Sequence, residues 1–195
     1  MTSRIPQADP AVLARAKDGD RAAHAWLYEA FAPFVYTLAR RILASSALAE
    51  DVLQETFVEV LRNVGSCRGH LEFGPWVRRI AVNRCLMHLR SPWIARRALT
   101  DAPETLTAVY DDEAPDEQAM LERALAALSA TARAVVWLHD VEGYTHEEIG
   151  RLMGRTTSFS KSQLARAHDR LRDLLEGERP QGATTELCAS ILKIS

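Results

Sequence analysis

The sequence predicts an all-α protein made of two small helical domains joined by a flexible acidic linker. Apolar residues recur every three or four positions in one segment after another, and no strand-like alternation of useful length appears. The stretch 98–119 breaks this pattern, because it carries seven acidic residues, no basic residue and no sustained apolar period. We therefore expect domains at residues 1–97 and 120–177, followed by a tail of unassigned role at 178–195.

The composition is that of an ordinary globular protein. The chain has 195 residues, of which 47% are hydrophobic and 26% are charged, and this length suits one domain or two small ones. No apolar run approaches the roughly 18 residues that a membrane span needs, and the polar start lacks the apolar core of a secretory signal. Cys67, Cys85 and Cys188 are odd in number and scattered, which argues against a disulfide framework. We expect a cytoplasmic protein with no membrane insertion.

Two helices are expected at the start of the first domain. Asp9 is a suitable N-cap and Pro10 a suitable first helical residue, and this short helix should end near Gly19. The segment 21–44 then carries apolar residues at helical spacing. Pro33 lies inside this segment and should interrupt its helix, because proline lacks the amide hydrogen.

Two more helices should complete the first domain. The segment 47–64 repeats the helical apolar pattern. A loop is expected from Gly65 to Gly74, after which Pro75 should begin a long helix. After the linker, helices are expected near 117–128, 130–140, 145–153 and 158–176.

The last two predicted helices form a helix-turn-helix pattern. Thr145 and Glu148 fit a capping box, and Gly154 is a natural residue to end the short helix that they open. The second helix has an apolar side and a basic and amide side, as a recognition helix presents to the major groove. Lysine and arginine can hold phosphates or guanine edges, and glutamine can read adenine. The alternative is an ordinary helical hairpin with solvated arginines. The exposed side consists of Lys161, Gln163, Arg166 and Arg170.

The charge of the chain is unevenly distributed. The net charge of −2 argues against a nucleic-acid binder when the chain is taken whole. However, residues 21–97 carry a net charge of +5, from eleven arginines and six acids, and residues 151–172 carry six bases and one acid. Two basic segments thus flank the acidic linker. Such blocks can also be plain solvated surface.

One side of the 47–64 helix is acidic and amide-bearing. Asp51, Gln54, Glu55 and Val58 fall together at spacings of three and four residues, opposite the apolar stripe. A polar face is usually just solvated, and none of these residues has an obvious local partner. An acidic face beside an apolar residue can also dock a basic partner helix.

The segment 67–90 mixes aromatic, arginine and asparagine residues across a loop and a helix. Aromatic stacking beside a basic track is what single-stranded nucleic acid requires. The alternative for Phe73 and Trp76 is a place in the hydrophobic core.

Two histidine patterns resemble metal sites only in part. His146 and Glu147 match the start of a zinc-protease helix, but Gly150 stands where the second histidine must fall. His139 and Asp140 are not accompanied by a further histidine cluster, and the cysteines lack zinc-type spacing. No nucleophile–base set converges, so we expect no enzyme activity, no metal and no cofactor.

The motifs together resemble a known family. The segments LAEDVLQETFVEVLRN and CRGHLEFGPWVRRIAVNRCLMHLR resemble region 2 of the extracytoplasmic-function sigma factors, the small two-domain branch of the sigma-70 family. The segment LSATARAVVWLHDVEGYTHEEIGRLMGRTTSFSKSQLARAHDRL resembles their region 4. The resemblance covers about residues 20–177.

This resemblance implies a transcription initiation factor without an enzymatic site. Such proteins bind core RNA polymerase, recognise and open promoter DNA, and are often held inactive by an anti-sigma factor. The residues implied for core polymerase are Asp51, Gln54, Glu55 and Val58. Those implied for the −10 element are Phe73, Trp76, Arg78, Arg79, Asn83 and Arg84, with Asn83 at the captured base. Those implied for the −35 element are Arg155, Ser158, Ser160, Lys161, Gln163, Arg166 and Arg170.

The chain departs from the family pattern at several positions. Cys67 stands where the family usually has an aromatic residue, and Pro75 replaces a commoner polar residue. In the recognition helix, Ser158, Phe159, Ser160 and Gln163 replace the commoner Gly, Thr, Val and Arg, which we interpret as an altered promoter preference.

Three other kinds of protein have parts of this pattern. A stand-alone helix-turn-helix regulator would not need the acidic face that is implied for polymerase docking. A helical enzyme or metal protein would need a convergent set of catalytic or metal-binding residues, which this sequence lacks. A protein-only adaptor that kept the fold would not need the six bases in 151–172.

Overall fold

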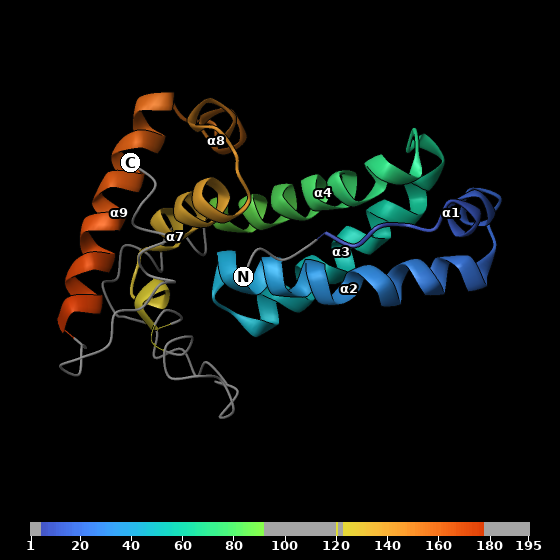
Figure 1. Cartoon of the computed structure of the whole chain (residues 1–195), viewed down its shortest axis with the longest axis horizontal. Helices are drawn as coiled ribbons and strands as arrows, with labels where there is room; N and C mark the ends of the chain where they lie inside the picture. Colours follow the sequence, from blue (N-terminus) through green and yellow to red (C-terminus); the bar gives the residue numbers. More distant parts are fainter. Residues whose placement is uncertain (1–4, 92–119, 121–122, 178–195) are drawn as a thin grey trace. The chain divides into compact units, whose positions relative to one another are not determined.

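The computed structural model describes residues 5–91, 120 and 123–177, and each element in this part of the chain is a helix (Figure 1). The chain divides into two compact units after Ser91. The prediction of an all-α protein with two helical domains is therefore confirmed. The predicted linker, the tail and the boundary at residue 97 lie outside the described residues. None of the described helices is long and apolar enough to cross a membrane.

The first helix begins as predicted. Helix α1 covers Pro10–Lys17, with Asp9 as its N-cap. The Asp9 Oδ1 atom accepts a hydrogen bond from the amide of Ala11 at 2.8 Å. This bond replaces one of those that a helix start lacks.

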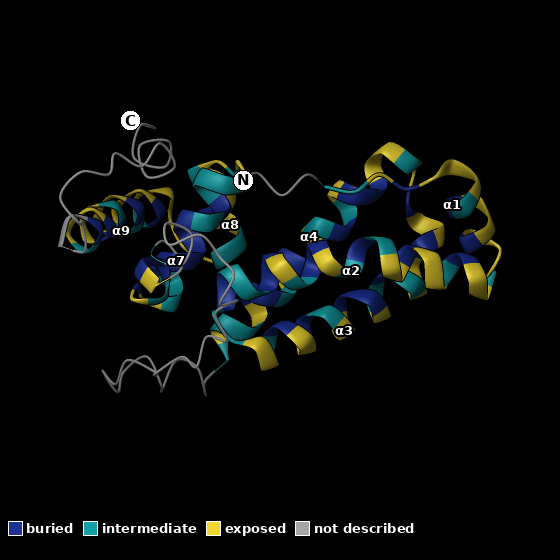
Figure 2. Ribbon diagram, turned by 60° about the horizontal axis from the view of Figure 1, so that its bottom comes forward, coloured by how far each residue is buried: buried dark blue, intermediate teal, exposed yellow. Residues whose placement is uncertain are grey.

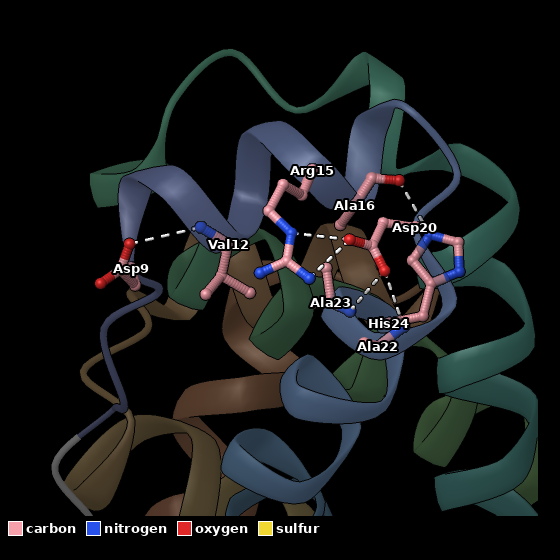
Figure 3. A network of polar contacts seen from close by, with 8 residues as sticks. All are labelled: Asp9, Val12, Arg15, Ala16, Asp20, Ala22, Ala23 and His24. Atoms are coloured by element: carbon pink, nitrogen blue, oxygen red, sulfur yellow. Dashed lines mark hydrogen bonds and ion pairs between the residues drawn. The ribbon is translucent and has the colours of Figure 1, made fainter.

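Asp20 has the same role at the start of α2, Arg21–Leu43 (Figure 3). Its Oδ1 atom accepts from the amide of Ala22 at 2.8 Å, and its Oδ2 atom accepts from Arg15 Nε at 2.6 Å. The Arg15 guanidinium and the Ala22 amide together lower the pKa of the Asp20 carboxyl from its usual value. This carboxylate therefore fastens the end of α1 to the start of α2.

Two prolines lie inside helices, and both predictions about them were wrong. Helix α2 runs through Pro33 without a break. Helix α4, His70–Arg90, already begins before Pro75, so the expected loop is reduced to the short 3-10 turn η1, Val64–Ser66, and the residues after it. Both prolines and the residues four positions before them are exposed, so water can solvate the carbonyl that each proline leaves unbonded.

Helices α2, α3 (Ser46–Asn63) and α4 pack against one another to form the core of the first unit. Each has a buried side and an exposed side, as the helical periodicity of the sequence predicts (Figure 2). Phe31 of α2 and Phe73 of α4 meet edge to face at 5.0 Å between ring centroids. Removal of the buried apolar side chains from water provides most of the favourable free energy that holds the three helices together.

The second unit contains the predicted helix-turn-helix. Its described helices are α7 (Ala130–Val136), α8 (His146–Met153) and α9 (Thr157–Gly177), with residues 123–126 also helical. The structure differs from the predicted helix 130–140 at its end, because α7 continues as a π-helical turn, η2, over Trp137–Val141. The largest buried side chains of this unit are Leu138, Ile149 and Leu171.

The turn between α8 and α9 depends on two glycines. The capping box of Thr145 and Glu148 opens α8 as predicted. Gly154 closes α8 with a φ of 63°, in the left-handed region that favours glycine. A Cβ atom on Gly150 would lie 3.0 Å from the carbonyl oxygen of Arg155, so a side chain at this position would crowd the backbone of the turn where it folds back on α8.

Candidate functional site

The structure brings the four predicted docking residues of α3 together on one exposed side. Asp51, Gln54, Glu55 and Val58 are all exposed, while the opposite side of α3 is buried in the core. Val58 is 49% exposed, whereas most large apolar side chains in the described part of the chain are buried or half-buried. The face therefore offers carboxylates and an amide around one apolar residue, which is the chemistry that a basic helix with an apolar stripe can match.

Glu55 does not have the unpartnered position that the sequence suggested. Its Oε1 atom lies 3.3 Å from His88 Nε2, and its Oε2 atom lies 3.8 Å from Arg84 Nη1, both on α4. The expectation that the docking residues have no local partner was therefore wrong for Glu55. The reason is tertiary, because these residues lie some thirty positions apart in the sequence.

Arg84 faces α3. Its Nε and Nη2 atoms lie 3.1 Å and 2.5 Å from Glu59 Oε2. Sequence reasoning missed Glu59 and His88, although a signal existed. Glu55 and Glu59 are four residues apart on one helix, and Arg84 and His88 are four residues apart on another, so each pair presents charges of matching spacing.

The outer side of α4 carries two of the predicted −10 residues, Arg79 and Asn83. Arg79 and Asn83 are exposed and lie one helical turn apart, while Trp76 and Arg78 are half-buried beside them. An exposed amide and guanidinium on one stripe can contact a base edge and a phosphate at the same time.

Phe73 belongs to the core and not to a DNA surface. Its side chain is fully buried, with its ring 5.0 Å from Phe31 and 5.8 Å from Trp76. We correct the prediction that Phe73 contacts the −10 element, since a base cannot reach a fully buried ring. Cys67 is buried as well, and its carbonyl accepts a hydrogen bond from Lys17 Nζ at 2.6 Å.

Helix α9, the predicted recognition helix, and the turn before it expose most of the predicted −35 residues. Gln163 is half-buried on the same helix, and the Arg155 guanidinium stacks 5.6 Å from the Phe159 ring centroid at the turn. Buried residues of α9, such as Leu164 and Leu171, hold this exposed side away from the core. The exposed members are Arg155, Ser158, Lys161, Arg166 and Arg170.

Ser160 is the exception among the predicted −35 residues. It is fully buried, and its Oγ atom lies 3.1 Å from His146 Nδ1. The prediction that Ser160 contacts DNA is therefore corrected: its hydroxyl ties α9 to the first residue of α8.

The histidines of the two partial metal motifs in the second unit contact one another and the Asp140 carboxylate. The Asp140 side chain, 1% exposed, lies between His139 Nδ1 at 2.8 Å and His168 Nε2 at 2.7 Å. The His139 ring stacks on His146 at 4.4 Å. Burial, and then the neighbouring His139 and Lys161, lower the pKa of His146. Each imidazole thus has a structural partner, and no group of His, Cys, Asp and Glu within the described residues is arranged to hold a metal ion.

Two family models match the chain. The model for sigma-70 region 2 matches residues 27–94, which include the exposed faces of α3 and α4. The model for sigma-70 region 4 matches residues 118–171, which include the helix-turn-helix. The region 2 match lies in the first structural unit apart from its last three residues, and the region 4 match lies in the second unit.

Curated relatives match nearly the whole chain. The RNA polymerase sigma factor CarQ of Myxococcus xanthus is 34% identical over 166 residues, which cover 84% of this chain and 95% of CarQ. The ECF RNA polymerase sigma factor SigM of Mycobacterium tuberculosis is 34% identical over 173 residues, which cover 88% of this chain and 87% of SigM.

A solved structure has the same fold. The sigma factor RpoE in complex with the anti-sigma factor NepR from Bartonella quintana superposes with a TM-score of 0.51 and 23% identity, over 76% of this chain and 93% of RpoE. The sequence comparisons and the fold comparison both agree with the helix-turn-helix and the exposed helix faces described above. The chain belongs to the extracytoplasmic-function sigma factors of the sigma-70 family, which are transcription initiation factors and not enzymes.

Proposed function

We propose that this sigma factor divides its work among three helices. Helix α3 docks on core RNA polymerase, α4 holds the −10 element of the promoter, and α9 reads the −35 element. The observation that carries the docking assignment is the exposed group of Asp51, Gln54 and Val58 on α3, which the core of the unit does not use.

The promoter-binding roles follow from side-chain chemistry and exposure. The Asn83 amide offers a donor and an acceptor, so it can pair with the edge of an unstacked base, and Arg79 beside it can hold a phosphate. Trp76 and Arg78 flank this position. On the recognition helix, Gln163 reads a base and the basic residues hold the DNA backbone. The residues that we assign to the −35 element are Arg155, Ser158, Lys161, Gln163, Arg166 and Arg170.

The docking assignment can be tested with the double variant Asp51→Ala/Gln54→Ala. Both residues are exposed, so we expect the free energy of unfolding to change by no more than about 0.5 kcal/mol. Binding to purified core polymerase in a pull-down should be largely lost, because charge-assisted contacts in a desolvated interface contribute roughly 2–5 kcal/mol where a partner is left unpaired. Glu29→Ala, which removes an exposed acid of α2, serves as the matched control and should bind normally.

Full polymerase affinity in the folded double variant would contradict the docking assignment. Glu55 is left intact in this test because it also bonds to α4, so its substitution would mix docking with packing.

We also infer a cytoplasmic location and an anti-sigma partner. Polymerase and the bacterial chromosome share the cytoplasm, and RpoE, which has the same fold, was solved in complex with the anti-sigma factor NepR. An inhibitor of this class should form a stoichiometric complex with the purified chain and displace core polymerase from it. Undiminished binding of core polymerase in a saturating excess of such an inhibitor would argue against competition.

A further inference from the structure

Four ionisable side chains join α3 to α4 and form what we call the α3–α4 charge cluster: Glu55, Glu59, Arg84 and His88. Arg84 Nε and Nη2 lie 3.1 Å and 2.5 Å from Glu59 Oε2, and Arg84 Nη1 lies 3.8 Å from Glu55 Oε2. His88 Nε2 lies 3.3 Å from the other oxygen of Glu55. Both carboxylate oxygens of a proposed docking residue therefore have partners on the neighbouring helix.

We propose that Arg84 is a positioning residue for polymerase docking. It holds Glu55 and Glu59 of α3 in place and so sets the shape of the docking face, and it does not bind the promoter. This inference rests on the docking role proposed above for α3.

The direction of the Arg84 side chain distinguishes it from its neighbours on α4. All three of its guanidinium nitrogens lie near carboxylates of α3, whereas Arg79 and Asn83 are exposed on the outer stripe of α4. The Arg84 side chain is only 29% exposed. To reach a phosphate it would have to give up two charge-assisted hydrogen bonds, which are the stronger class of hydrogen bond in proteins.

Glu55 remains able to contact polymerase while Arg84 and His88 hold it. Each carboxylate oxygen has two lone pairs, so it can accept from α4 and from a partner at once. The cluster restricts the rotamers of Glu55, and a side chain that is already ordered loses less entropy when it binds.

Removal of Arg84 should change the affinity for core polymerase in opposite directions, depending on whether the net charge of the docking face or the positioning of Glu55 and Glu59 dominates. Loss of a positive charge makes the docking face more negative, so attraction to a basic partner alone predicts tighter binding of polymerase. Loss of positioning predicts weaker binding, because Glu55 and Glu59 are freed. The sign of the change therefore decides between the two effects.

The experiment measures the affinity of the full-length chain for core polymerase by titration. We expect Arg84→Ala to weaken binding about fivefold, the fold-change typical of the upper range for partly exposed ion pairs. The swap Arg84→Glu/Glu59→Arg keeps the net charge and rebuilds the ion pair between positions 59 and 84. The new arginine lies four residues from Glu55 on α3 and can pair with it, so the swap should return the affinity to within about twofold of the parent. Arg21→Ala, at an exposed position of α2, is the matched control for loss of an arginine.

A second measurement separates positioning from DNA contact. Holoenzyme is assembled at saturating core polymerase, and its binding to a single-stranded −10 oligonucleotide is measured. Arg84→Ala should leave this binding unchanged, whereas Arg79→Ala should weaken it. If Arg84→Ala melts below the assay temperature, Arg84→Gln, which keeps a hydrogen-bond donor and most of the side-chain volume, takes its place.

Three results would overturn the inference: unchanged or tighter polymerase binding by Arg84→Ala, a loss of oligonucleotide binding equal to that of Arg79→Ala, or no recovery in the swap. Failure of the docking role itself would look different. In that case Asp51→Ala/Gln54→Ala would bind polymerase as the parent does, whatever the Arg84 variants do.

Discussion

The Asn83 amide can satisfy both a donor and an acceptor on a base edge, and its place on the exposed side of α4 leaves it open to DNA. We expect Asn83→Ala to weaken promoter opening by roughly 1–3 kcal/mol, which is the discrimination that such a bidentate contact supplies. Permanganate footprinting of the melted region measures the effect, with core binding as the internal control. Equal open-complex formation by variant and parent would remove Asn83 from the proposed −10 site.

Gly150 provides a second test at the scale of one residue. Alanine stabilises a helix by roughly 1 kcal/mol relative to glycine, but overpacking a tight contact costs about 1–3 kcal/mol. At Gly150 the new Cβ would lie 3.0 Å from the backbone of the turn, and backbone cannot move aside as a flexible side chain can. We therefore expect Gly150→Ala to lower the free energy of unfolding by about 1 kcal/mol, measured by thermal unfolding.

Gly65→Ala is the control for this substitution, because a Cβ there meets nothing within 4 Å and the position lies in the short 3-10 turn. A Gly150→Ala variant as stable as the Gly65→Ala variant would show that the turn has more room than its geometry indicates.

The two kinds of DNA contact that we propose for α9 should respond differently to substitution. Gln163→Ala should change the preference at one −35 position, since an amide reads a base edge. Lys161→Ala and Arg166→Ala should weaken binding to all promoters about equally and reduce the salt dependence by about one counterion each, as phosphate contacts do. Promoter-library transcription at two salt concentrations measures both effects. A uniform loss for Gln163→Ala would mean that Gln163 contacts the backbone instead.

At the scale of single helices, the capping residues predicted correctly where helices begin, but the proline rule predicted wrongly that Pro33 and Pro75 could not lie inside helices. The side chains of Asp9 and Thr145 cap the helices that follow them, as their sequence neighbours indicate. Pro33 and Pro75 lie within helices because packing of the surrounding turns outweighs one lost hydrogen bond on an exposed side. Propensity rules do not contain that packing term.

The charge distribution of the whole molecule predicts how the free protein treats DNA. The seven acids of 98–119 separate two basic segments in the sequence. Their negative charges repel the phosphate backbone of DNA over roughly 10 Å at 0.1 M salt. Neutralising this stretch should raise the salt-sensitive, sequence-independent affinity of the isolated chain for duplex DNA. The affinity is measured by fluorescence anisotropy below 0.1 M salt. An unchanged affinity would make the stretch a spacer only. The residues to neutralise are Asp111, Asp112, Glu113, Asp116 and Glu117.

The sequence by itself determined the helical class, the division into two domains, the helix-turn-helix with its caps, and the exposed face of α3. The helices and their exposed faces depend on contacts within a few residues along the chain, so periodicity and capping residues are enough to predict them. The division into two domains was predicted from the acidic stretch 98–119, which lacks an apolar period.

Only the tertiary structure decided which of the predicted site residues are free to act. Phe73 and Ser160 carry suitable chemistry for DNA but are buried, and Arg84 pairs with Glu59, 25 residues earlier in the chain. Helical periodicity tells which residues share a face, but not which face of a neighbouring helix lies opposite. That choice is made by the packing of the whole core, because burial and ion pairs between helices depend on residues far apart in the sequence.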